Sequence, residues 1–269
     1  MRHISIAATI ILAAGAAQAC GSDTDCMIGD RSYRIAMPEG HDGTTPVPAI
    51  AFAHGYRGSA AGVMRNGSLR GLADELGAAL IAFNSVSGTW QLPYHPSHME
   101  ADGSAEFAYV DAVLADAARR FAIDSERIMA TGFSSGGMMT WNLACSRSAI
   151  FAGFVPVAGT FWMEPPESCG TPVTSIIHIH GDNDSTVPLD GRVIGPSKQG
   201  EVDAALAMYS DFGGFAPVSE GQQYGTLTCD ARANDAGDML TFCLFEGGHS
   251  FRTEFVRFGW QQLKEAGRL

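Results

Sequence analysis

The sequence predicts an α/β protein, a single domain in which helices cover both faces of a mainly parallel sheet. Short apolar runs rich in Ile, Val and Phe alternate along the chain with longer segments of helical period. These runs are hydrophobic almost throughout, which is typical of parallel strands buried on both faces. Five runs predict the strands of the sheet: 49–54, 79–84, 127–132, 153–158 and 175–180.

The segments between and around these strands complete the predicted order of elements. Residues 32–37 alternate in polarity as an edge strand does, and 222–245 predict a late hairpin around the turn-forming residues 234–237. Five segments with helical period predict the helices: 59–76, 104–121, 135–145, 201–212 and a closing helix at 253–266.

The first residues have the pattern of an export signal. Arg2 precedes the short apolar run 4–14, and Ala17-Gln18-Ala19 has the small residues of a cleavage site. The expected domains are therefore a signal peptide at 1–19 and a catalytic domain at 20–269, in the periplasm or outside the cell. A lipid anchor on Cys20 is the less favoured alternative, because Ala17 stands where that processing normally has a Leu-like residue.

Charge and cysteine content restrict the partners and the compartment. The chain has a formal net charge of −12 and no cluster of Lys and Arg, so nucleic acid and anionic membranes are not expected partners.

Six cysteines in the exported part suggest three disulfides. Pairing of sequence neighbours is one of many possible connectivities, and it joins Cys20 with Cys26, Cys145 with Cys169, and Cys229 with Cys243.

The segment 132–137 supplies a candidate nucleophile. It reads G-x-S-x-G around Ser134, after a predicted strand and before a predicted helix. A serine at such a strand-to-helix turn projects its Oγ into a cleft, and the flanking glycines are needed because side chains there would clash with neighbouring backbone. The predicted strand before the motif and the predicted helix after it make a nucleophile more plausible here than an ordinary glycine-rich turn.

A serine nucleophile needs a histidine base, and the histidine needs a carboxylate that fixes its tautomer. In proteins where a G-x-S-x-G serine lies between a strand and a helix of a mainly parallel sheet, the catalytic residues follow one another in the chain as Ser, then acid, then His. Of the eight histidines, only His249 satisfies this order and lies in a loop. The acid is expected in the loop 181–188, where Asp184 is preferred because it can reach further across, and Asp182 remains the alternative.

The backbone around the nucleophile also predicts an oxyanion hole. One donor is the N–H of the residue after the nucleophile, here Ser135, and the other is expected from the glycine-rich turn at 53–58. Tyr56 is the preferred second donor and Gly55 the alternate. His54 precedes the serine, so we expect it to hold this turn in shape through hydrogen bonds.

A metal site is the competing interpretation of His178 and His180. H-x-H-x-D resembles the start of a zinc motif in metallo-β-lactamase-type hydrolases, and a strand places both rings on one face. That motif continues with a histidine where Asn183 stands. Two buried histidines held by hydrogen bonds beneath the acid loop are the preferred interpretation.

With these motifs in order, the chain resembles the secreted α/β-hydrolase esterases grouped with polyhydroxybutyrate depolymerases and the feruloyl and acetylxylan esterases of carbohydrate esterase family one. The resemblance rests on segments 31–38, 54–55, 123–139, 180–188 and 247–249. It implies the α/β-hydrolase fold, an acid at Asp184 and an oxyanion donor at Tyr56. It differs after His249, where Ser250-Phe251-Arg252 replaces a common Trp-Pro pair.

The expected activity is hydrolysis of a small or oligomeric ester, of hydroxyalkanoate or feruloyl and acetyl type, through an acyl-enzyme and without a metal or organic cofactor. A catalytically silent binding protein on the same fold is the alternative, which the complete set of Ser, Asp and His disfavours. The sequence does not set the oligomeric state. Five aromatic residues are candidates for the substrate pocket: Tyr56, Trp90, Tyr94, Phe161 and Trp162.

Overall fold

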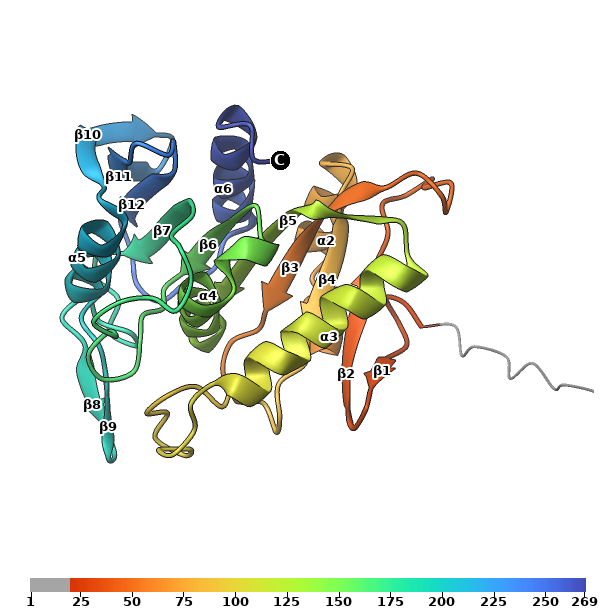
Figure 1. The fold of residues 1–269 in the computed structure, drawn as a ribbon, viewed down its shortest axis with the longest axis horizontal. Coiled ribbons are helices and arrows are strands. Elements are labelled where there is room, and N and C mark those ends of the chain that lie inside the picture. Colours follow the sequence, from red (N-terminus) through yellow and green to blue (C-terminus); the bar gives the residue numbers. More distant parts are fainter. Residues whose placement is uncertain (1–19) are drawn as a thin grey trace, which may run out of the picture.

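The computed structural model describes residues 20–269, so the predicted signal peptide at 1–19 lies outside the described residues. Its centre is a ten-stranded sheet with the order β1-β2-β4-β3-β5-β6-β7-β12-β11-β10 (Figure 1). Six strands in the middle of the sheet are parallel to one another, namely β3, β4, β5, β6, β7 and β12. This confirms the prediction of a mainly parallel sheet. Their bounds are Val47–Ala53, Ala79–Phe83, Ile123–Phe133, Gly153–Val157, Ile176–Gly181 and Met239–Phe245.

Helices cover both faces of this sheet, as predicted. Alternate residues of β3 show the two faces: Ala51 packs with the core under α3, α4 and α5, whereas Phe52 packs with the core under α1, α2 and α6. The first group of helices comprises Ser104–Arg120, Ser135–Ser146 and Val202–Gly213, and the second Ala60–Met64, Gly67–Glu75 and Thr253–Glu265. Within residues 20–269, no helix has the length and apolar character needed to cross a membrane.

The helix predicted at 59–76 is wrong in one respect, because the structure divides it into α1 and α2. Asn66 has an extended backbone, and its side chain accepts a hydrogen bond from Leu69 N at 3.1 Å. Asparagine in this position caps the start of a helix, and Gly67 then begins α2. The capping side chain competes with a continuous helix, so two short helices form.

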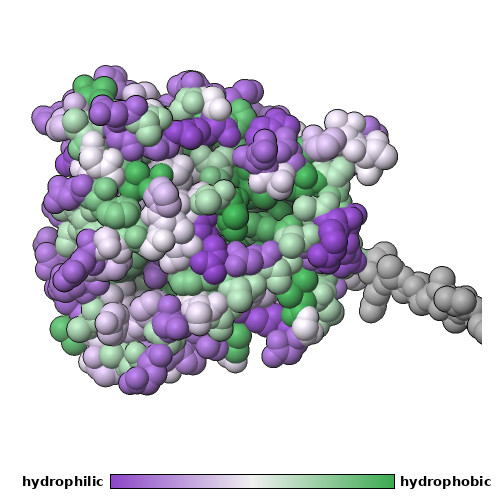
Figure 2. Space-filling model, viewed as in Figure 1, coloured by the Kyte–Doolittle hydropathy of each residue, from purple (hydrophilic) through white to green (hydrophobic). Residues whose placement is uncertain are grey.

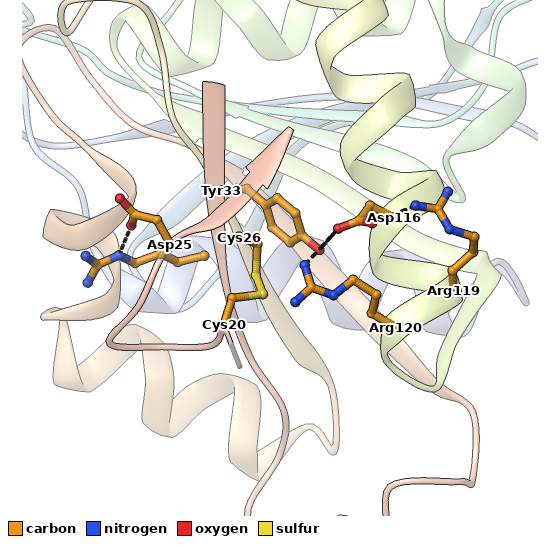
Figure 3. The surroundings of a disulfide bond; sticks show 8 residues. Cys20, Asp25, Cys26, Tyr33, Asp116, Arg119 and Arg120 are labelled. Carbon is orange, nitrogen blue, oxygen red and sulfur yellow. Dashed lines mark hydrogen bonds and ion pairs between the residues drawn. A yellow bond between two sulfur atoms is a disulfide. The ribbon is translucent and has the colours of Figure 1, made fainter. Parts of the chain in front are cut away.

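The amino-terminal edge of the sheet also differs from the prediction. The strand β2 (Arg31–Ala36) is not the outermost strand, since β1 (Cys26–Ile28) pairs with it on the outside and the Cys20–Cys26 disulfide holds the chain there. From β2 the Tyr33 hydroxyl donates to Asp116 of α3 at 2.9 Å (Figure 3). Burial, and then this carboxylate, raise the pKa of Tyr33 well above its ordinary value.

The carboxyl-terminal end of the sheet contains the predicted late hairpin. β11 (Leu227–Ala233) pairs antiparallel with β12, and Asn234 shapes the turn by accepting from the N–H groups of Ala236 and Asp238. A further strand, β10 (Ala216–Tyr224), pairs with β11 through two register shifts and forms the open edge. The other two disulfides join Cys145 with Cys169 and Cys229 with Cys243, as the neighbour pairing predicts.

Hydrophilic and hydrophobic side chains are mixed on the face shown in Figure 2, and a hollow with hydrophobic walls opens above α3. A groove of about 690 Å³ lies there, between α3 and β5, with Leu114, Ile128 and Phe151 among its lining residues.

Two short segments lie apart from the sheet. One is the 3-10 turn Ser148–Ile150. The other is a two-stranded hairpin of β8 (Arg192–Ile194) and β9 (Ser197–Gln199), called the cleft hairpin below.

Candidate active site

Ser134 lies on the tight turn between β5 and α4. Its backbone has φ 59° and ψ −120°, a positive φ that costs free energy in a residue other than glycine. Surrounding backbone enforces this conformation: Ser134 N donates to Val157 O at 2.9 Å, and a Cβ on Gly136 would lie 1.9 Å from Ala53 O. The glycines of the motif are therefore required by close approach of β3 and α4.

Asp184 and His249 meet at the carboxyl ends of β7 and β12. His249 Nδ1 and Asp184 Oδ2 are 2.7 Å apart, and the carboxylate is almost completely buried. The other oxygen, Oδ1, accepts from the N–H groups of Thr186 and Val187 at 2.8 Å each. An ionised carboxylate accepts these bonds, so the His249 ring donates from Nδ1, and its neutral tautomer has an unprotonated Nε2.

The charge state of Asp184 follows from opposing effects. Burial alone would raise the pKa of this carboxyl, but hydrogen bonds from His180, His249 and the two backbone N–H groups outweigh burial and hold its pKa well below the ordinary value of 3.8. Asp184 therefore remains a carboxylate at neutral pH and can stabilise a positive charge on His249.

Asp182, the alternative acid, has a different position. Its side chain is exposed, and Oδ1 accepts from Gly247 N at 2.9 Å. Backbone bonds from Asp182 N to Phe245 O and from Asn183 N to Gly247 O, both at 3.0 Å, join the same two loops. Asp182 thus ties the acid loop to the loop that carries His249, and it forms no hydrogen bond or ion pair with the His249 imidazole.

Ser134 and His249 lie on adjoining segments. The ring of Phe133, the residue before the nucleophile, packs against the His249 ring with centroids 4.6 Å apart. Within residues 20–269 no hydrogen bond joins Ser134 Oγ to the imidazole. In free enzymes such catalytic bonds are often long and tighten when substrate binds.

His178 and His180 form a hydrogen-bonded chain beneath the acid loop. Trp141 Nε1 donates to His178 Nδ1 at 3.0 Å, and His178 Nε2 lies 2.9 Å from His180 Nδ1. His180 Nε2 lies 2.8 Å from Val187 O and 3.4 Å from Asp184 Oδ2. Because the Trp141 donor fixes Nδ1 of His178 as an acceptor, both neutral rings carry their proton on Nε2. All four ring nitrogens have partners in the protein, in line with the preferred interpretation of these two histidines.

The turn at 54–58 has the predicted support from His54. This buried ring has Nδ1 2.8 Å from Gly55 O, and its Nε2 accepts from Ser85 N at 3.2 Å. Burial lowers the pKa of His54 and keeps the ring neutral, although the bond to Gly55 acts in the opposite direction. Trp90 Nε1 donates to His54 O at 2.9 Å. The turn is therefore fixed from both sides.

The residues expected to supply the oxyanion donors, Tyr56 and Ser135, line the same cleft as Ser134. Ser135 begins α4, where the first N–H groups of a helix have no partner within the helix. Within the described residues the N–H of Tyr56 makes no hydrogen bond, whereas the N–H groups of Arg57 and Gly58 bond to Gly88 O and Gly55 O. Gly55 approaches Ser134 closely, since a Cβ on it would lie 3.6 Å from the Ser134 Cβ.

A cleft of about 340 Å³ opens over Ser134 and contains some of the aromatic residues predicted for the substrate pocket. Tyr56 and Trp162 line it, whereas Tyr94 and Phe161 line an adjoining groove that shares Trp162. The prediction for Trp90 is wrong: its side chain is completely buried and supports the His54 turn instead. An indole with no exposed surface cannot contact a substrate.

Several lining residues were missed by sequence reasoning, namely His95, Thr186, Arg192 and Gln199. Thr186 lies in the same loop as the predicted acid, so proximity in the chain was an available signal. Arg192 and Gln199 come from the cleft hairpin, whose strands are too short to show a hydrophobic period. His95 precedes the nucleophile, so chain order excludes it as the catalytic base, but this argument says nothing about a place in the cleft lining.

The fold and this arrangement of residues define an α/β-hydrolase-fold protein with a serine hydrolase type of site. Residues 97–194, which include Ser134 and Asp184, match the phospholipase/carboxylesterase family. Across 89% of this chain and 95% of the other, the structure resembles the acetyl xylan esterase from Aspergillus awamori, with a TM-score of 0.62 and 15% identity. That likeness concerns the fold.

Curated relatives narrow the class further. The chain is 32% identical to the putative esterase NocK of Nocardia uniformis subsp. tsuyamanensis over 62% of its own length, but it spans only 49% of that protein. It is 27% identical to feruloyl esterase C of Emericella nidulans, over 82% of this chain and 77% of that one. The predicted resemblance is confirmed for its esterase part: the chain is similar to carboxylic ester hydrolases, feruloyl esterase C among them.

Proposed function

We propose that this protein is an exported serine esterase in which Ser134, His249 and Asp184 form the catalytic triad. The observation that carries the proposal is the strained Ser134 turn at the end of β5, beside an Asp184–His249 pair joined at 2.7 Å. Strain of this kind persists only where surrounding structure enforces it, and it concentrates at functional sites. The three disulfides support an oxidising compartment.

In the proposed acylation, Ser134 Oγ attacks the ester carbon while its proton passes to His249 Nε2. Asp184 stabilises the imidazolium through the bond to Nδ1, and the N–H groups of Tyr56 and Ser135 donate to the oxyanion. The leaving alkoxide takes the proton from His249 and departs as the alcohol. Water then attacks the acyl-enzyme with His249 again as base, which releases the acid and restores Ser134.

The substrate classes favoured by the comparisons are feruloyl and acetyl esters of plant polysaccharides, and the sequence resemblance adds hydroxyalkanoate oligomers. A cleft of about 340 Å³ fits a small acyl group and part of its alcohol. The adjoining groove, of about 570 Å³, extends past Trp162 and offers room for a longer substrate.

Turnover of 4-nitrophenyl butyrate by the wild type, and its loss in Ser134→Ala, tests the proposal. Labelling of the wild type by a fluorophosphonate, and its absence in the same variant, checks that the serine is the nucleophile. Wild-type protein that neither turns over the ester nor takes the label contradicts the proposal. A panel of hydroxybutyrate oligomers, methyl ferulate and acetylated xylan then identifies the substrate class.

A further inference from the structure

Among the residues lining the cleft over Ser134 there is no aspartate or glutamate, and the charged residue is Arg192. The other lining group that could carry a positive charge is His95. Burial, and then the neighbouring His98, lower the pKa of His95 to about 4, so this ring is neutral near pH 7. At neutral pH the charge of the cleft lining is therefore positive, in a chain whose formal net charge is −12.

The guanidinium of Arg192 is held in place but has no anionic partner. Its Nε donates to Gln199 Oε1 at 3.0 Å, across the cleft hairpin, and its Nη1 donates to Ser185 O in the acid loop at 3.3 Å. Within residues 20–269 no carboxylate lies within ion-pair distance of it. Nη2 and one N–H of Nη1 make no hydrogen bond in this part of the chain.

Other arginines of the protein show what this one lacks. Arg31, Arg147 and Arg268 each form an ion pair with an Asp or Glu. Nine of the 16 Lys and Arg residues in the described chain are paired in this way. What distinguishes Arg192 among the unpaired cations is its place: two hydrogen bonds hold its guanidinium in the lining of the cleft that contains Ser134. A planar guanidinium matches the geometry of a carboxylate, which accepts two parallel N–H bonds.

We infer that Arg192 binds a carboxylate of the substrate, so that the preferred ester carries a free acid group on its acyl or its alcohol part. The inference rests on the proposed function and narrows its substrate class. A hydroxyalkanoate oligomer has such a group at one end, whereas a feruloyl or acetyl ester of a neutral sugar has none. Arg192 acts in binding and takes no part in proton transfer.

Two matched pairs of substrates test this inference. The first pair is the 3-hydroxybutyrate dimer and its primary amide, with the acid on the alcohol part; the second is monomethyl adipate and its carboxamide analogue, with the acid on the acyl part. We expect the wild type to prefer the acid in at least one pair by about 10–100-fold in kcat/KM, the size typical of a charge-assisted hydrogen bond.

Arg192→Gln should abolish this preference, because KM should rise much more for the acid than for its matched amide. Lys198→Gln is the matched control: it removes the same charge from the same hairpin, where Lys198 pairs with Glu201 outside the cleft lining. It should keep the preference. Added salt should weaken the preference in the wild type, because screening acts on an exposed charge.

Two results overturn the inference. One is equal turnover of acid and amide by the wild type in both pairs, and the other is a preference that survives Arg192→Gln. In either case hydrolysis of the amides, or of 4-nitrophenyl butyrate, leaves the proposed esterase function standing. Absence of turnover on all of these esters contradicts the proposed function itself, and with it the inference.

Discussion

Two walls of the cleft are built in opposite ways. On the nucleophile side, segment 132–137 is pressed against backbone: a Cβ on Gly132, Gly136 or Gly137 would lie 2.3 Å, 1.9 Å or 2.6 Å from a carbonyl oxygen. On the other side, the cleft hairpin extends into solvent, with Val193 75% exposed and nothing within 4 Å of a Cβ on Gly195. The groups proposed for catalysis are fixed by the sheet, whereas the group proposed for selectivity is carried by a segment free to vary.

The largest effect is expected on the fixed side, at the acid. Asp184→Asn should lower kcat/KM by about 10²–10⁴-fold, because the amide cannot stabilise an imidazolium and disturbs the His249 tautomer. Asp182→Asn is the matched control, since it keeps the acceptor for Gly247 N. Steady-state kinetics on 4-nitrophenyl butyrate measure both variants. A greater loss in Asp182→Asn would reverse the assignment of the acid.

Gly136→Ala tests the packing of the same wall. The added methyl would overlap Ala53 O, so the β3 end or α4 must shift, and a displacement of this kind near a nucleophile costs roughly 10²-fold in rate. Activity and thermal unfolding are measured together. Near wild-type activity in a normally folded variant would show that the turn has more room than the structure indicates.

His178→Phe tests the buried chain under the acid loop. It leaves Trp141 Nε1 and His180 Nδ1 without their partners, so the free energy of unfolding should fall by about 2–4 kcal/mol. Adding Trp141→Phe should restore part of this loss, because the orphaned indole donor is then removed. Urea unfolding gives both values. Additive losses in the double variant would refute the coupling.

Acidification should destabilise the fold between about pH 6.5 and pH 4. Burial holds the pKa of His178 well below its ordinary 6.5, and that of His95 at about 4, so both are neutral in the folded protein. In the unfolded chain both bind protons below about pH 6.5, so the unfolded state takes up more protons as pH falls and gains in relative stability.

Urea unfolding at pH 7.5, 6 and 5 measures this dependence, and His95→Gln should make it shallower. Asp184 does not contribute strongly in this window. Its lowered pKa gives stability that is lost only when pH falls below its ordinary 3.8. Equal unfolding free energies at pH 7.5 and pH 5 would contradict the expectation.

The smallest effect is expected on the open side. Gly195 has φ +56° at the tip of the cleft hairpin and free space around it, and asparagine tolerates this backbone region. Gly195→Asn should change the free energy of unfolding by less than about 1 kcal/mol and leave 4-nitrophenyl butyrate turnover unaltered. A loss as large as that of Gly136→Ala would remove the contrast between the walls.

The same contrast explains what sequence could predict. Ser134, Asp184 and His249 can be proposed from the sequence because local backbone chemistry and chain order restrict the candidates, and the buried strands can be predicted because hydrophobic runs mark them. The cleft hairpin was missed because three-residue strands have no period, and Arg192 because its role depends on contacts with Ser185 and Gln199. Trp90 was wrongly predicted to line the substrate pocket, because the sequence around an aromatic residue in a loop does not show whether its side chain faces solvent or the core.

The open edge of the sheet has a consequence for association between copies. An unpaired outer strand is a template onto which another chain can add, and repeated addition builds fibrils. β10 is interrupted along its length by register shifts on both sides of Ser219, Pro217 offers no N–H, and Glu220 places a charge on the exposed strand. A second copy therefore meets an irregular row of hydrogen-bonding groups, which disfavours growth of an intermolecular sheet from this edge.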